Sequence, residues 1–196
     1  MPVREIRTEE IEQAVKKLFI EANYRLPCAT EKKIEQALQT EISAPCKMAL
    51  TAIRDNLSAA EELNIPICQD TGMAVLFAEI GRDVHFDGPF EEAVNRGVRA
   101  AYLEGYMRCS VVKDPLNRIN TNDNTPAVIH TTITEGNTVT LTAAPKGFGS
   151  ENMSRIRMFN PTAERQEIIR FVAETVKTAA SNPCPPVIVG VGIGGT

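Results

Sequence analysis

The spacing of apolar residues changes about a third of the way along the chain, and this change limits the folds that the chain can adopt. In the first part, apolar residues recur every three or four positions, which predicts amphipathic helices over residues 8–24, 30–40 and 45–63. Helices followed by mixed strands are typical of an α+β fold. We therefore expect an N-terminal helical region over residues 1–65. A mixed β-sheet with packed helices should follow over residues 66–196, as one continuous α+β region of catalytic type.

The second region alternates β-type runs with helical stretches. The predicted strands cover residues 73–80, 127–134, 137–144 and 187–191, and the predicted helices cover residues 90–104 and 161–180. Two of these runs surround Glu135-Gly136-Asn137, a turn-forming sequence, so we expect them to form a β-hairpin.

Charge and composition narrow the function classes. The net charge is −4, so a general basic surface for nucleic acid is not expected. No apolar run is long enough to cross a bilayer. The N-terminal residues lack the features of a signal peptide, and we expect a cytoplasmic protein that binds neither nucleic acid nor membrane.

The chain contains an odd number of cysteines without close spacing. They are Cys28, Cys46, Cys68, Cys109 and Cys184. A disulfide framework is therefore not expected, and the absence of a Cys-x-x-Cys motif argues against a zinc site of the usual kind. We interpret Cys28 and Cys46 as packing residues, and the role of Cys109 stays open.

The motif Cys68-Gln69-Asp70-Thr71-Gly72 directly precedes a predicted strand. A thiol, an amide and a carboxylate follow one another here, and a turn is needed to gather them around one point. A functional site is one interpretation, and a buried structural thiol at Cys68 is the other. Cys184 lies between prolines, outside any helix interior, where it suits either a metal ligand or a packing role.

Three further segments have both a functional and an ordinary interpretation. Lys146-Gly147-Phe148-Gly149-Ser150-Glu151-Asn152 suits a backbone anion site or a simple loop. Arg108 suits a carboxylate clamp or a surface position. Residues 117–125, which contain four asparagines, suit a solvated loop, the interpretation we favour. The chain stops on Gly-Ile-Gly-Gly-Thr where a helix would normally follow, so we expect a C-terminal truncation.

Four motifs together resemble one family. They are Ile-Cys-Gln-Asp-Thr-Gly at 67–72, Lys-Gly-x-Gly-Ser-Glu-Asn at 146–152, Cys-Pro-Pro at 184–186 and Gly-Ile-Gly-Gly-Thr at 192–196. Their order is that of the class I, iron–sulfur-dependent fumarate hydratases. More closely, the chain resembles the α subunit of the two-subunit fumarate hydratase and L(+)-tartrate dehydratase family, over nearly its whole length.

The resemblance implies a [4Fe–4S] cluster held by three cysteines. Cys68 and Cys184 match two ligand positions, and the third ligand is absent from this chain. Gln69 and Asp70 match residues that contact the dicarboxylate substrate and take part in catalysis. Arg108 matches an arginine that pairs with a substrate carboxylate, and Gly149 lies where the backbone approaches the ligand.

The implied activity is that of a hydro-lyase of the tricarboxylic acid cycle, the reversible hydration of fumarate to (S)-malate. The alternatives are an L(+)-tartrate dehydratase α subunit and a non-catalytic fragment or scaffold subunit that is inactive alone. The resemblance also implies a β subunit, which carries a threonine as the base, and an α–α dimer. We expect activity only together with that β subunit and the missing C-terminal segment.

Overall fold

The computed structural model describes residues 3–194 and divides the chain into two compact units, residues 1–146 and 147–196. Each unit has its own arrangement of elements. Strands and helices are mixed in the first unit, as an α+β fold requires, so the expected fold class is confirmed. The expected division at residue 65 stays a prediction.

The four long helices of the first unit follow the expected ranges closely. They are α1 (Thr8–Tyr24), α2 (Cys28–Thr40), α3 (Ala44–Leu63) and α4 (Phe90–Glu104). None of the helices within residues 3–194 combines the length and the apolar character needed to span a bilayer. The N-terminus of α1 is held from a distance, because the main-chain N–H of Thr8 donates to Asp87 Oδ1 at 2.7 Å. That bond to the N–H of Thr8 lowers the pKa of the Asp87 carboxyl.

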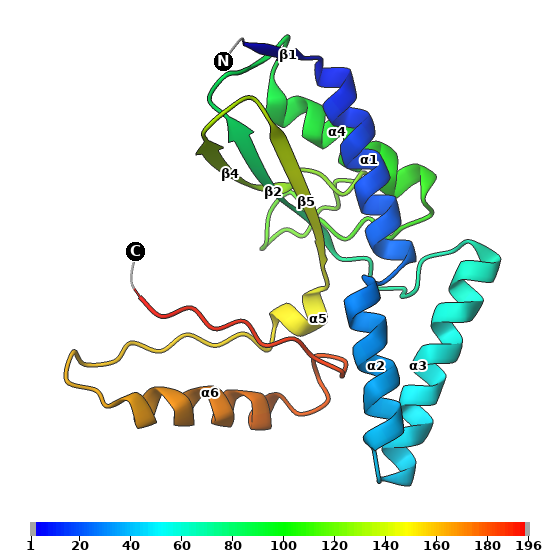
Figure 1. Cartoon of the computed structure of the whole chain (residues 1–196), viewed down its shortest axis with the longest axis vertical. Coiled ribbons are helices and arrows are strands. Elements are labelled where there is room, and N and C mark those ends of the chain that lie inside the picture. The colour runs from blue at the N-terminus through cyan, green and yellow to red at the C-terminus, as the bar shows by residue number, and fades with distance from the viewer. Residues whose placement is uncertain (1–2, 195–196) are drawn as a thin grey trace. The chain divides into compact units, whose positions relative to one another are not determined.

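A three-stranded sheet forms the centre of the first unit, with α1 and α4 on one of its faces (Figure 1). The strands are β2 (Met73–Gly81), β4 (Val128–Thr134) and β5 (Val139–Lys146), and their spatial order is β4-β2-β5. β2 runs parallel to β4 and antiparallel to β5. The short strands β1 (Arg4–Ile6) and β3 (Val84–Phe86) form a separate parallel pair. The sequence did not predict this pair.

The expected hairpin between the last two strands is wrong, because β2 lies between β4 and β5. Their connection crosses the end of β2, where Gly81 donates to the carbonyl of Thr138 at 2.8 Å. A Cβ atom on Gly81 would lie 2.4 Å from the carbonyl oxygen of Gly136. The glycine at the end of β2 therefore lets the connection pass directly over it, and the two flanking strands pair with β2 on either side.

Helices α1 and α4 pack closely against each other over the sheet. Ile11, Val15 and Phe19 of α1 recur at a spacing of four and are buried in the core. The helices approach at Gly97, where an added Cβ would lie 2.6 Å from the carbonyl oxygen of Glu12. The core that they form also includes the start of β2, the strand that follows the Cys68 segment.

The second unit contains α5 (Phe148–Glu151) and α6 (Arg165–Ala179). The helix expected over residues 161–180 begins later, because residues 161–162 form a turn. The strand expected over residues 187–191 is also wrong. These residues are exposed and make no ladder, and a strand requires a hydrogen-bonded neighbour. Residues 195 and 196 of the terminal glycine-rich motif lie outside the described residues.

Candidate functional site

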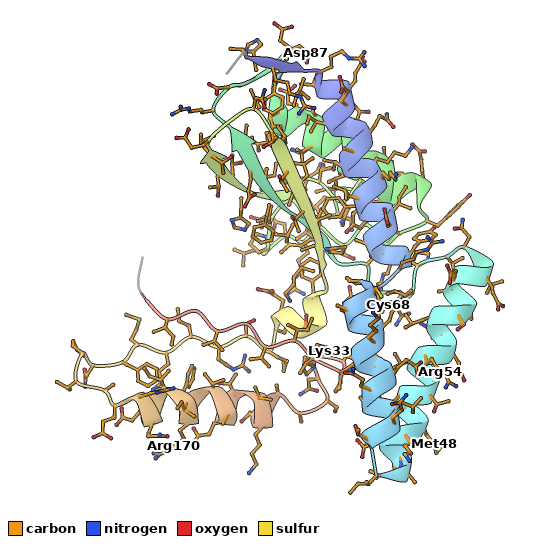
Figure 2. All side chains as sticks on the ribbon, in the orientation of Figure 1. Lys33, Met48, Arg54, Cys68, Asp87 and Arg170 are labelled. Carbon is orange, nitrogen blue, oxygen red and sulfur yellow. The ribbon has the colours of Figure 1, made fainter. Side chains whose placement is uncertain are left out.

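The segment that carries Cys68 joins α3 to β2 beside the end of α1 (Figure 2). Its main chain is tied to both helices. Ile67 donates its N–H to the carbonyl of Asn23 at 2.9 Å, and its own carbonyl accepts from Asn56 Nδ2 at 2.8 Å. Cys68 is exposed, so the interpretation of a buried structural thiol is wrong.

The exposed and buried parts of the motif have different roles. Gln69 and Asp70 are exposed like Cys68, whereas Thr71 and Gly72 are buried. The buried hydroxyl of Tyr102 donates to the carbonyl of Thr71 at 2.9 Å. The polar side chains that suit chemistry therefore face solvent, while the residues below them hold the loop.

Arg108 is brought to this loop through its main chain. Its N–H donates to the hydroxyl oxygen of Thr71 at 3.0 Å, and the same hydroxyl lies 3.4 Å from its carbonyl oxygen. The Arg108 side chain is exposed. An exposed thiol, an amide, a carboxylate and a guanidinium thus come from adjoining segments, a combination that can bind a carboxylate substrate beside a soft metal centre.

The asparagine-rich loop is not simply solvated, which corrects the interpretation favoured above. Asn124 is fully buried and has a positive φ of 59°. Its Nδ2 donates to the carbonyl of Gly72 at 3.1 Å, and its Oδ1 accepts the N–H groups of Ser110 and Val111 at 2.7 and 3.1 Å. Sequence reasoning missed this residue. The available signal was a run of asparagines, which favour such turns and side-chain-to-backbone bonds.

The environment of Cys109 differs from that of Cys68. Burial raises the pKa of the Cys109 thiol, and the nearby Asp123 carboxylate adds to the effect. Burial also opposes ionisation of Asp123, but hydrogen bonds from Thr125 and Arg99 outweigh it and lower its pKa to about 2. Cys109 is a half-buried thiol packed against the core, and its raised pKa disfavours the thiolate form.

The other two cysteines of the first unit do not pack as expected. Cys28 and Cys46 are both exposed, at the beginnings of α2 and α3. Their interpretation as packing residues is therefore wrong. Met48 of α3 is also 74% exposed.

Two candidate residues belong to the second unit. Gly149 is exposed on α5, and an added Cβ there would contact nothing within 4 Å. Cys184 is exposed, has a positive φ of 58°, and donates its N–H to the carbonyl of Ser181 at 3.2 Å. The expectation that Cys68 and Cys184 meet at one centre stays a prediction, as do the roles of Gln69, Asp70 and Gly149.

The donor set has the chemistry of part of an iron–sulfur site. Cys68 and Cys184 are exposed thiols, the ligand type that holds such clusters, and Cys68 Sγ accepts the N–H of Asp70 at 3.4 Å. Hydrogen bonds to ligand sulfur are one way in which proteins tune these clusters. Within residues 3–194, no three His, Cys, Asp or Glu side chains form a metal-binding group. The two thiols therefore have the chemistry of cluster ligands, and their joint role stays a prediction.

Comparisons with known proteins give consistent results. A family model described as fumarate hydratase (Fumerase) matches residues 12–196. The chain is 38% identical over 194 residues to the putative L(+)-tartrate dehydratase subunit alpha of Methanocaldococcus jannaschii, a match that covers 95% of this chain and 68% of that protein. It is 31% identical over 193 residues to the L(+)-tartrate dehydratase subunit alpha of Escherichia coli strain K12, covering 93% of this chain and 63% of that protein. The chain thus spans about two thirds of the length of these relatives.

Proposed function

The chain belongs to the fumarate hydratase (Fumerase) family, and from this membership we propose that it is the α part of a [4Fe–4S] hydro-lyase. The proposed reaction is the reversible addition of water to fumarate, which gives (S)-malate. The enzyme would act as a cytoplasmic heteromer with a β subunit, and an α–α dimer is part of the proposal. The alpha-subunit names of its relatives support the β-subunit partner.

One observation carries the proposal. The exposed Cys68-Gln69-Asp70 run lies on a loop whose buried Thr71 binds the main chain of Arg108. A dicarboxylate needs a cationic partner for a carboxylate and polar groups for its hydroxyl, and these must lie beside the metal ligands. The adjoining segments provide these group types together.

The chain's own side chains would act mainly by binding and orientation. The planar guanidinium of Arg108 can form two parallel hydrogen bonds to one substrate carboxylate. Gln69 can donate its amide to the substrate, and the Asp70 carboxylate can accept a hydrogen bond from the substrate hydroxyl. The exposed backbone at Gly149 leaves room for close approach of a ligand.

Cys68 and Cys184 are the residues of this chain that would hold the cluster. When bound, it supplies a Lewis-acidic iron that polarises the substrate's hydroxyl and carboxylate. The bond from the Asp70 N–H to Cys68 Sγ would also tie the loop conformation to the ligand sulfur.

L(+)-tartrate, dehydrated to oxaloacetate, is the second candidate substrate. The observation in its favour is that both relatives described above are named as subunits of L(+)-tartrate dehydratase. Steady-state turnover of the complete α/β enzyme, measured on fumarate, (S)-malate and L(+)-tartrate, separates the two. If the enzyme turns over none of these three compounds, both substrate proposals are refuted, and the remaining alternative is a non-catalytic scaffold subunit.

Cluster binding is tested by anaerobic reconstitution of the assembled enzyme with iron and sulfide. We expect the visible absorbance of the cluster to be lost in Cys68→Ser and in Cys184→Ser. Cys28→Ser is the matched control, because this thiol is also exposed and lies on a different element. An unchanged spectrum in Cys68→Ser would contradict the ligand assignment.

The role of Arg108 is tested by Arg108→Ala. Loss of a charge-assisted bond should weaken dicarboxylate binding by about 1.5–3 kcal/mol, seen as a raised KM. Arg82→Ala is the control, because Arg82 is exposed and pairs with Glu135 on the surface at 3.1 Å. Equal KM values in Arg108→Ala and the wild type would remove Arg108 from the binding site.

A further inference from the structure

We propose that Asn124 is a positioning residue that sets the spacing between the Cys68 loop and Arg108. The inference rests on the proposed function, because it concerns the same site. Asn124 is fully buried, and its side chain binds the main chain of Gly72, Ser110 and Val111. The proposal is that Asn124 acts through the main chains of the two segments that carry the site.

The first step is the lack of a direct main-chain link. In residues 3–194, no main-chain hydrogen bond joins residues 68–72 to residues 107–111. The two segments belong to no common sheet. Their relative position therefore depends on side chains that reach from one to the other.

The second step is that Asn124 binds both segments at once. Its amide nitrogen donates to the Gly72 carbonyl at the end of the Cys68 loop, and its amide oxygen accepts from Ser110 and Val111, just beyond Arg108. One short, fully buried side chain thus uses three hydrogen bonds as a bridge. The bridge is rigid because burial excludes competing water.

The third step is that Thr71 forms a second link between the two segments. Its hydroxyl accepts a hydrogen bond from the main-chain N–H of Arg108, and its carbonyl accepts one from the hydroxyl of Tyr102. With Asn124 on one side and Thr71 on the other, the main chain from residue 108 to residue 111 is fixed against the loop. Asn120 adds to this by donating to the Cys109 carbonyl at 2.7 Å.

The fourth step connects this geometry with the substrate. A dicarboxylate held by Arg108 must present its reacting carbon at a fixed distance from the centre that Cys68 helps to hold. A displacement of about 1 Å between the two can cost on the order of a hundredfold in rate. The Asn124 bridge is therefore expected to control catalysis without contact with the reacting atoms.

The test compares two glycine variants of the same loop. Asn124 and Asn122 both have positive φ, at 59° and 67°, so glycine suits both backbones. Asn122 is exposed, and only Asn124 bridges the two segments. Asn122→Gly therefore reproduces the change in backbone freedom and leaves the bridge intact.

Two readouts use the isolated full chain. In Asn124→Gly, amide exchange over residues 68–73 should be at least about tenfold faster, whereas exchange in the middle of α4 stays unchanged. The rate at which iodoacetamide alkylates Cys68, measured relative to Cys28 in the same molecule, should differ from that of the wild type in Asn124→Gly but not in Asn122→Gly. Equal behaviour of Asn124→Gly and Asn122→Gly would overturn the proposal.

A second pair of variants decides the matter if Asn124→Gly does not fold. Thr71→Val keeps the side-chain shape and removes the hydroxyl, while Thr71→Ser keeps the hydroxyl. We expect faster exchange over residues 107–111 in Thr71→Val and near wild-type exchange in Thr71→Ser. Without this difference, side-chain ties do not fix the two segments and the proposal fails.

The last readout separates positioning from a purely structural role. In the assembled enzyme, Asn124→Gly or Thr71→Val should lower kcat/KM at least about tenfold while subunit assembly and cluster absorbance are retained. A loosened loop with unchanged kcat/KM would refute positioning. If the wild-type enzyme turns over no dicarboxylate, the proposed function fails, while the exchange and alkylation results still decide whether Asn124 holds the two segments.

Discussion

Removal of one hydroxyl, in Tyr102→Phe, should destabilise the first unit measurably although the ring stays in place. The Tyr102 side chain is fully buried, and its hydroxyl donates to the Thr71 carbonyl at 2.9 Å. A typical hydrogen bond contributes about 1 kcal/mol, but removal of one partner of a buried bond costs about 1–3 kcal/mol, because the carbonyl left behind has no partner. Because the Cys68 loop can relax at its exposed end, we expect a total loss of about 1–3 kcal/mol.

The chain offers its own controls, since it contains three tyrosines in graded environments. Tyr24 donates to the Gly105 carbonyl at 3.1 Å from a half-buried position, so Tyr24→Phe should cost about 0.5–1 kcal/mol. Tyr106 is 88% exposed, and Tyr106→Phe should stay within about 0.5 kcal/mol of the wild type. The assay is urea unfolding with a common m-value.

The order of the three losses is the decisive result. If Tyr102→Phe costs no more than Tyr106→Phe, the buried hydrogen bond to Thr71 does not hold the loop. The proposed support of the exposed loop by buried residues is then refuted. A loss in Tyr102→Phe accompanied by faster amide exchange at residues 71–73 would connect the stability effect to the candidate site.

Three further results are expected. Gly97→Ala should destabilise by about 1–3 kcal/mol in urea unfolding, because its Cβ would lie 2.6 Å from the Glu12 carbonyl, whereas Gly149→Ala, with nothing within 4 Å, should be near neutral. Folding lowers the pKa of Asp123 from 3.8 to about 2, so the wild type should lose more stability than Asp123→Asn as the pH falls through that interval. Burial raises the pKa of Tyr102 in the folded state, so the neutral hydroxyl contributes its full stability below about pH 10, and this stability is lost as the pH rises further. In alkaline unfolding titrations, Tyr102→Phe should therefore lose less stability above that pH than the wild type does.

Local patterns in the sequence predicted most of the helices, because their signal is contained within each helix. The buried positions 11, 15 and 19 of α1 illustrate this, since their spacing defines one face whatever the helix packs against. Strand pairing carries no such local signal. The two runs around Gly136 satisfied the sequence rules for a hairpin, and only the close crossing at Gly81 shows why they pair with β2 instead.

The candidate site shows the same division between local and long-range information. Cys68, Gln69 and Asp70 are adjacent in sequence, so a local motif could predict that they lie together on one loop. Asn124 binds a carbonyl 52 residues away, and nothing in its own neighbourhood identifies that partner. The asparagine-rich composition predicted turns correctly, but the burial of one member depends on the fold of α4 and β2 around it.

Within a few residues, the side chains proposed to bind ligands are separate from the side chains that hold the main chain in place. Cys68, Gln69, Asp70 and Arg108 are exposed, whereas the side chains that bind the main chain at Arg108 and at the residues beside these four are buried, namely Thr71, Tyr102 and Asn124. Substitution of an exposed member should therefore change ligand or metal binding with little effect on unfolding, because little buried area or bonding is lost. Substitution of a buried member should change both ligand binding and the free energy of unfolding, since the loop and the Arg108 segment lose the hydrogen bonds that join them. A variant series in which exposed and buried members lost stability equally would show that the loop is held by its own side chains and not from below.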